Sequence, residues 1–184
     1  IGLIPGGGVA ISGGRIVAVG DVSGYRADRA IDAQGGVIMP GFVDSHTHVV
    51  FGGSRVDEYA AKVSGQTPPA RVPVGITGTV ATTRAATAEQ LLQESSARVR
   101  EMVNSGTTTL ESKSGYGLDS KHELRLLETS QQLGELMPVD VVSTYLGAHA
   151  FPVDVPHDRY VDEVVNLIPE VAERGLAEFC DVYC

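Results

Sequence analysis

From Pro40 onward, short β-branched segments alternate with longer amphipathic ones, and this alternation limits the fold more than any other feature of the sequence. The short segments predict four strands, at residues 41–50, 107–112, 139–146 and 179–182. Apolar residues recur three and four positions apart in the longer segments, which predicts three helices, at residues 87–104, 120–137 and 161–175. Strands that alternate with helices indicate a parallel sheet with crossover helices, either doubly wound or part of a (β/α)8 barrel. The sequence ends in the fourth strand, so a barrel would be about half complete.

Local signals mark where two of these helices begin and end. Thr87 and Gln90 have the spacing of a capping box, in which the first side chain accepts a hydrogen bond from the third helical amide. Ser120 and Glu123 repeat this spacing before the second helix. Gly106 stands where a glycine commonly ends a helix. These signals support the helical prediction for both segments.

The stretch between the first strand and the first helix, at residues 51–83, is rich in Gly and Pro and is expected to be a long loop. Such a loop exceeds the usual length of a connection inside a compact domain. We therefore expect it to be functional or partly structured.

The first forty residues follow a different pattern. Gly and Pro recur every few positions, and short β-branched alternations such as residues 15–19 lie between them. This pattern is typical of small antiparallel strands. It predicts one region at residues 1–39 and a separate α/β region at residues 40–184.

The composition excludes several classes of partner. The net charge is −9 and no run of Lys or Arg occurs, so the chain offers no electrostatic footprint for nucleic acid or an anionic membrane. No apolar run approaches the roughly 18 residues that a membrane helix needs. Cys180 and Cys184 are too few for a disulfide framework, which favours a reduced compartment and a cytoplasmic location.

The sharpest local motif is His46-Thr47-His48, at the end of the first expected α/β strand. Side chains repeat with a period of two along a strand, so both imidazoles would point to the same side and could share one ion. Neutral imidazole suits zinc or iron, and two ligands leave room for further ligands and a water. A pair with this spacing also arises by chance. Its position at the carboxyl end of a strand, where barrel enzymes place their chemistry, favours the metal interpretation.

The segment from Pro40 to His48 resembles the first barrel strand of the amidohydrolase superfamily. Three further segments are similar to its imidazolonepropionase family, which acts in histidine breakdown: V-A-T-T-R-A-A at residues 80–86, K-S-G-Y-G-L at residues 113–118 and L-G-A-H-A at residues 146–150. The resemblance covers most of the chain. It implies a (β/α)8 barrel at residues 40–184, preceded at residues 1–39 by part of a small β-sandwich.

The resemblance also implies the site residues. His46 and His48 match two ligands of a single divalent metal, zinc or iron, whereas Arg55, Tyr116 and His149 match residues that contact the substrate. An Arg guanidinium can hold the substrate's propionate in a planar fork. Without this context, Arg55 would be interpreted as a solvated charge and His149 as a capping or packing residue. His149 could also polarise the ring carbonyl or transfer a proton, which makes it the candidate catalytic residue.

Other polar residues receive different interpretations. Lys113 is interpreted as structural, and Asp44 as an acceptor that orients one of the two imidazoles. His122 and His157 are expected to be solvated. Glu111 has no assigned role.

The implied reaction is the hydrolysis of the cyclic amide of 4-imidazolone-5-propanoate to N-formimidoyl-L-glutamate. The family's remaining metal ligands and its acid and base would follow residue 184, so residues 1–184 alone are expected to bind metal weakly, to lack turnover and to expose an apolar sheet edge. Two alternatives stay open: another cyclic amidohydrolase or deaminase, and a non-catalytic metal-binding module. A homodimer also stays open.

Overall fold

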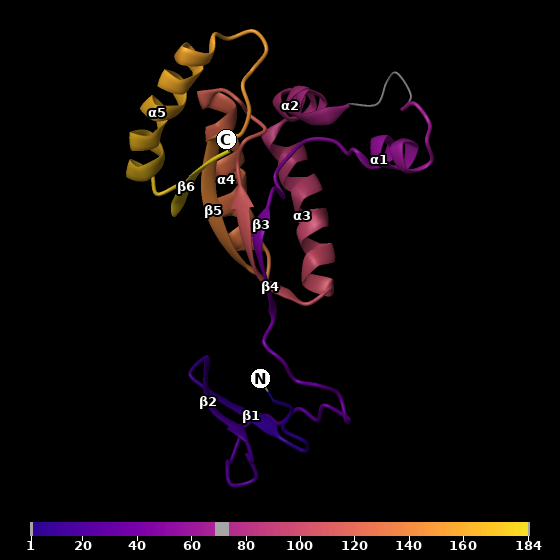
Figure 1. Cartoon of the computed structure of the whole chain (residues 1–184). Helices are drawn as coiled ribbons and strands as arrows, with labels where there is room; N and C mark the ends of the chain where they lie inside the picture. The colour runs from indigo at the N-terminus through magenta and orange to yellow at the C-terminus, as the bar shows by residue number, and fades with distance from the viewer. Residues whose placement is uncertain (1, 69–73, 184) are drawn as a thin grey trace. The chain divides into compact units, whose positions relative to one another are not determined.

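The computed structural model describes residues 2–68 and 74–183 (Figure 1). The chain forms two compact units, Ile1–Pro40 and Gly41–Cys184.

The first unit contains a two-stranded antiparallel sheet. Strand β1 (Gly8–Ser12) pairs with β2 (Arg15–Gly20), and Ser12 lies opposite Arg15. The two residues between them, Gly13 and Gly14, have φ angles of +57° and +74°. Positive φ at both central positions defines the hairpin turn that best fits twisted strands, and glycine adopts it without steric cost. The antiparallel strands expected in this region are therefore confirmed.

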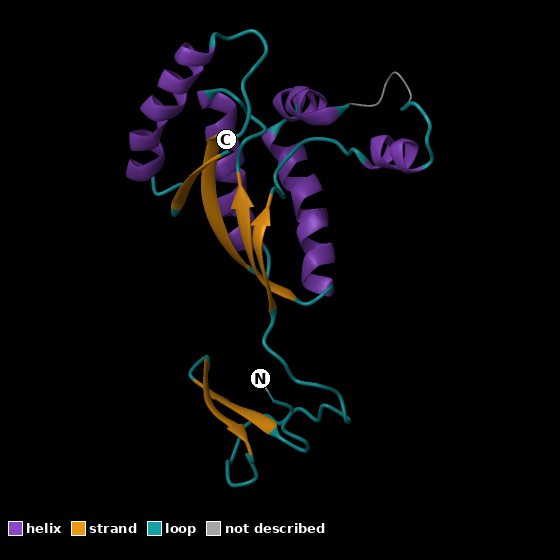
Figure 2. Cartoon of the chain, viewed as in Figure 1, coloured by secondary structure: helices purple, strands orange, loops and turns teal. Residues whose placement is uncertain are grey.

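The second unit is built on a curled sheet of four parallel strands, in the order β3-β4-β5-β6 (Figure 2). The strands are β3 (Phe42–Thr47), β4 (Thr107–Lys113), β5 (Asp140–Ala148) and β6 (Phe179–Val182). The helices that precede β4, β5 and β6 are α3 (Ala88–Asn104), α4 (Ser120–Leu136) and α5 (His157–Glu173). Each strand pairs with the next one along the chain, and right-handed crossovers then place the helices on one face. This order is that of a partial (β/α)8 barrel, and a doubly wound sheet would reverse direction at its switch point.

The segment expected to be a long loop contains two helices, α1 (Val56–Val63) and α2 (Gly75–Ala85). The prediction of a loop throughout was wrong, and the alternative of partial structure was right. Gly and Pro concentrate at the borders of these helices, where they conceal two short helical segments from a composition argument. Residues 69–73 lie outside the described part of the chain.

One predicted helix cap is confirmed and one is wrong. Thr87 accepts a hydrogen bond from the Gln90 amide, and the Gln90 side chain accepts one from the Thr87 amide. Helix α4 is instead capped by Asp119, whose carboxylate accepts a hydrogen bond from the His122 amide at 2.8 Å. The Glu123 side chain turns away from this helix end to bind the loop before it.

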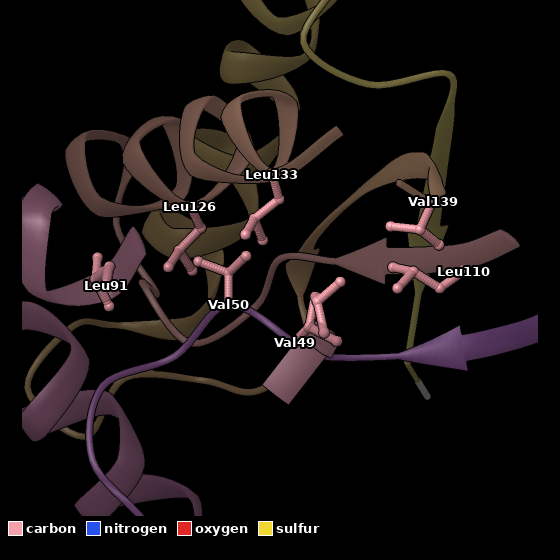
Figure 3. Packing of buried hydrophobic residues seen from close by; sticks show 8 residues of the cluster. Val49, Val50, Leu91, Leu110, Leu126, Leu133 and Val139 are labelled. Carbon is pink, nitrogen blue, oxygen red and sulfur yellow. The ribbon is translucent and has the colours of Figure 1, made fainter. Parts of the chain in front are cut away.

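The main core lies between the sheet and helices α3 and α4 (Figure 3). Val49 and Val50, directly after β3, are buried, and Val50 points toward Leu126 and Leu133 of α4 (Figure 3). This packing anchors the segment that follows the two histidines.

The spacing of Val161, Val164, Val165 and Ile168 predicts one buried stripe on helix α5, but of these four residues only Val164 packs against the buried core. Val161, Val165 and Ile168 are 47%, 55% and 37% exposed, whereas Tyr160, Leu167 and Val171 are at most 5% exposed. The helix has two apolar stripes, and periodicity alone cannot say which one meets the sheet. Within the described ranges, no helix is long and apolar enough to cross a membrane.

Candidate metal and substrate site

The two histidines of the H-x-H motif lie together at the carboxyl end of β3. Their ring centroids are 5.9 Å apart, with an interplanar angle of 68°. Between them, the Thr47 hydroxyl donates a hydrogen bond to the Glu111 carbonyl oxygen at 2.5 Å, which ties the end of β3 to β4. His46 is exposed and His48 is half-buried. Strand geometry therefore brings the two imidazoles together, as the spacing predicted.

His48 has the properties of a neutral imidazole. Burial, together with the neighbouring His149 and His46 rings, lowers the pKa of His48 to about 4. Its Nδ1 atom is buried and has no hydrogen-bond partner among the described residues. A neutral ring with an unpartnered nitrogen is the form that binds a divalent metal, so the pair fits the metal that the motif implies.

The pair supplies only part of a coordination shell. Among residues 2–68 and 74–183, no group of three or more His, Cys, Asp or Glu side chains converges as a metal site would require. Two imidazole donors leave further ligand positions to other groups.

Tyr116 and His149 complete an aromatic cluster around His48. The His48 ring stacks on His149, with centroids 4.6 Å apart, and the Tyr116 ring lies 5.1 Å from His48 and 5.2 Å from His149. Tyr116 comes from the loop after β4, and His149 comes from the end of β5. The carboxyl ends of three parallel strands thus contribute side chains to one site.

A backbone bond sets the tautomer of His149. Its Nδ1 atom lies 2.9 Å from the Gly115 carbonyl oxygen. A carbonyl oxygen only accepts, so Nδ1 carries the proton of this bond. In the neutral ring, Nε2 then holds the free lone pair.

Arg55 lines a neighbouring cavity of about 320 Å³ together with Tyr116. The side chain is not a free surface charge: its Nε and Nη2 atoms donate to the two oxygens of Glu58 at 2.7 Å and 3.2 Å. Because Tyr116 belongs to both the cavity wall and the aromatic cluster, the cavity adjoins the histidines.

Glu58 is a site residue that the sequence analysis missed. It is 1% exposed and also accepts bonds from Lys62 Nζ at 2.6 Å and from the Gly75 amide at 3.0 Å. The hydrogen bond from Arg55, followed by those from Lys62 and Gly75, lowers the pKa of Glu58 to about 2. The signal that could have found it is the spacing of Arg55, Glu58 and Lys62, which places all three on one face of a helical turn.

Lys113 joins β4 to β6 inside the curled sheet. It is 5% exposed, and its Nζ atom lies 2.9 Å from Glu111 Oε1 and 2.8 Å from Asp181 Oδ2. Burial lowers the pKa of Lys113, but the hydrogen bonds to Asp181 and Glu111 outweigh this effect and raise it overall. Glu111 also accepts a bond from the Thr144 hydroxyl at 2.6 Å. Lys113 is therefore a protonated cross-link between strands.

The remaining sequence candidates lie in different surroundings. Asp44 is exposed, and no hydrogen bond within the described part of the chain joins it to a histidine, so the expected contact that would orient an imidazole is not formed. His122 is half-buried and its Nδ1 bonds the Asp119 carboxylate, so the expectation that it is solvated was wrong. His157 is exposed, as expected, and stacks on Phe151 with ring centroids 3.9 Å apart.

Comparisons with known proteins relate the chain to the amidohydrolases. The profile of the Amidohydrolase family matches residues 29–84. An imidazolonepropionase from Caldanaerobacter subterraneus subsp. tengcongensis is 46% identical over 182 residues, which cover 96% of this chain and 44% of the relative. Imidazolonepropionases from Alkaliphilus metalliredigens and Geobacillus kaustophilus are each 44% identical, over 99% and 100% of this chain and 46% of each relative. The chain thus spans about half the length of the curated relatives it matches. By the sequence that it shares with these relatives over nearly all of its residues, the chain belongs to the imidazolonepropionase family of the amidohydrolases.

Proposed function

We propose that the protein hydrolyses the cyclic amide C–N bond of 4-imidazolone-5-propanoate, giving N-formimidoyl-L-glutamate, with His46 and His48 as two ligands of one zinc or iron ion. The observation that carries this proposal is the position of Tyr116, which lines the Arg55 cavity and also lies against His48 and His149. In this proposal, Arg55 as the carboxylate-binding group would adjoin His46 and His48 as the metal-binding pair. The relatives named above are imidazolonepropionases, and enzymes of the amidohydrolase family typically depend on a metal.

The metal chemistry required here is general. A bound divalent ion lowers the pKa of its water toward about 7 and polarises the amide carbonyl. His46 and His48 would hold that ion through neutral imidazole nitrogens, which the low pKa of His48 supports.

Arg55 would hold the propionate of the substrate. Glu58 already engages the edge formed by Nε and Nη2, so the substrate carboxylate would approach the guanidinium from its Nη1 side. Lys62 and Arg55 carry two positive charges against the single negative charge of Glu58. This surplus of one positive charge suits a substrate tail with one carboxylate.

Tyr116 and His149 would act on the ring. Burial raises the pKa of Tyr116, and the nearby Arg55 lowers it by less, so the phenol stays protonated at neutral pH and donates a hydrogen bond. The Nδ1 of His149 is bound to the Gly115 carbonyl, which leaves Nε2 to hold or move a proton at the substrate. The same proposal includes a small-molecule substrate in the cytoplasm and no nucleic-acid partner, in line with the net charge of −9.

The test uses the protein at its full natural length, metal-loaded and incubated with 4-imidazolone-5-propanoate. We expect loss of the imidazolone absorbance and formation of formimidoylglutamate, identified by mass spectrometry. A panel of other cyclic amides and of amino-substituted heterocycles serves as the control. If the protein hydrolyses a compound of the panel but not the imidazolone, the proposed substrate is wrong and that compound takes its place. If the protein binds metal but hydrolyses none of these compounds, the result favours a non-catalytic metal-binding module.

A further inference from the structure

We propose that Glu123, on the first turn of α4, is a positioning residue for this site: it holds the loop at residues 114–118 in the conformation that places Tyr116 against His48 and His149. The inference rests on the proposed function for its kinetic test only. Glu123 itself lines neither the cavity nor the aromatic cluster.

The Glu123 carboxylate accepts hydrogen bonds from backbone amide groups of this loop. Its Oε2 atom accepts from the Gly115 amide at 2.9 Å, and its Oε1 atom accepts from the Gly117 and Leu118 amides at 2.7 Å and 2.9 Å. The side chain is 1% exposed. One buried carboxylate therefore provides the acceptors for three backbone donors within four consecutive residues.

The carbonyl groups of the same loop are bound by two other side chains. Arg84 of α2 donates from Nε to the Gly117 carbonyl at 2.7 Å and from Nη2 to the Leu118 carbonyl at 2.8 Å. His149 donates to the Gly115 carbonyl. Side chains from three separate elements thus replace the ladder bonds that a regular strand would have.

The loop would not keep this conformation by local preference. Leu118 has a φ angle of +50°, which is unfavourable for a residue with a side chain. A Cβ atom at Gly117 would lie 2.5 Å from the Glu123 amide nitrogen, and one at Gly115 would lie 2.7 Å from the Cβ of His149. The close approaches require glycine at positions 115 and 117, whereas the unfavourable φ of Leu118 requires an external restraint, which the three bonds to Glu123 supply.

The chemistry of the restraint needs a carboxylate. Three donors converge on two oxygens that only accept. A glutamine of the same shape would turn an NH2 group toward at least one amide donor, leaving that donor unpaired and buried. Tyr116 lies inside the restrained segment, between two of the bound amides. A substitution of Glu123 therefore affects the substrate site by displacing Tyr116.

The experiment is a double-mutant cycle in the protein at its full natural length. Glu123→Gln is measured in the native background and in a Tyr116→Phe background, with Glu135→Gln, an exposed carboxylate of the same helix, as the matched control. We expect Glu123→Gln to lower kcat/KM about tenfold in the native background and less than about twofold after Tyr116→Phe. Equal factors in the two backgrounds would mean a merely structural effect and would overturn the proposal.

A second readout does not depend on turnover. In protein labelled with ring-13C tyrosine, the signal that is lost in Tyr116→Phe is that of Tyr116. Glu123→Gln should shift this signal because the ring leaves the His48 and His149 rings, whereas Glu135→Gln should not. An unshifted Tyr116 signal overturns the positioning role. If Glu123→Gln fails to fold, Glu123→Asp, which keeps the charge but shortens the reach, is judged by the same two criteria. If the native protein does not hydrolyse the imidazolone, the proposed function fails and the spectrum alone decides the role of Glu123.

Discussion

The guanidinium of Arg55 and the carboxylate of Glu58 form a two-bond ion pair in which Arg55 is 40% exposed and Glu58 is 2% exposed at the side chain. The buried partner is thus fixed and the exposed partner is oriented by it. This relationship leads to a first prediction.

Glu58→Gln should weaken substrate binding more than it slows turnover. The variant loses the charged acceptor that orients Arg55, so KM for the imidazolone should rise about tenfold while kcat falls by less. Steady-state kinetics of the full-length protein measure this split. Asp57→Asn, an exposed acid in the same helical turn, is the control and should leave both constants unchanged. A fall in kcat at constant KM would contradict the orienting role.

The same pair predicts a pH dependence of stability. Hydrogen bonds from Arg55, and after it from Lys62 and Gly75, lower the pKa of Glu58 from 4.5 to about 2. A lowered native pKa contributes stability above pH 4.5 that is lost as the pH falls toward about 2, because protonation then favours the unfolded chain. The unfolding temperatures of the native protein and of Glu58→Gln should therefore differ most near neutral pH. This difference should shrink as the pH falls from 4.5 to about 2. A constant difference over this range would contradict the assignment.

His46→Ala and His48→Ala should each reduce bound metal. Removal of one of two imidazole donors from the site should lower metal affinity at least about tenfold. The measurement is metal content by atomic emission after dialysis against a weak chelator. His157→Ala removes an exposed imidazole stacked on Phe151, and this variant should retain its metal. The same measurement on the native protein identifies zinc or iron.

Lys113→Met should destabilise the second unit. The substitution leaves Glu111, which is 17% exposed at its side chain, without its cation. Because both carboxylate partners keep some contact with solvent, we expect a loss of about 1–3 kcal/mol in the free energy of unfolding rather than the larger cost of a fully buried pair. Urea unfolding measures this loss. Lys121→Met, at an exposed position of α4, should change the free energy by less than about 0.5 kcal/mol.

Leu126→Ala tests the core beneath the site. Leu126 is 1% exposed and lies opposite Val50, so the cavity left by its truncation should cost about 2–5 kcal/mol (Figure 3). Leu136→Ala, at a position of the same helix that is 65% exposed, should cost less than about 1 kcal/mol. Similar losses for both variants would mean that the packing around Val50 is not as described.

Features governed by local rules could be predicted from the sequence. The Thr87 capping box, the glycine turn of the first hairpin and the pairing of His46 with His48 each depend on residues a few positions apart. The parallel sheet followed from the alternation of strand and helix patterns. The proximity of Arg55, Tyr116 and His149 came from the family resemblance, because no local rule relates residues so far apart along the chain.

The two buried glutamates show why the rest could not be predicted. Glu58 and Glu123 lie in first helical turns, where acidic residues commonly favour the helix dipole or complete a cap. Their burial depends on donors from other elements, namely the Gly75 amide for Glu58 and the loop after β4 for Glu123. For the same reason, the sequence could not reveal which apolar stripe of α5 is buried, since that depends on the surfaces of α4 and β5 that it meets.

The order of strands in the curled sheet has a consequence for biosynthesis. Each of β4, β5 and β6 pairs with the strand that directly precedes it in the chain, so each of these strands finds its partner already made. The sheet can therefore grow one strand and helix at a time while the polypeptide is still leaving the ribosome, and the histidine pair at the end of its first strand exists before the residues that surround it are translated.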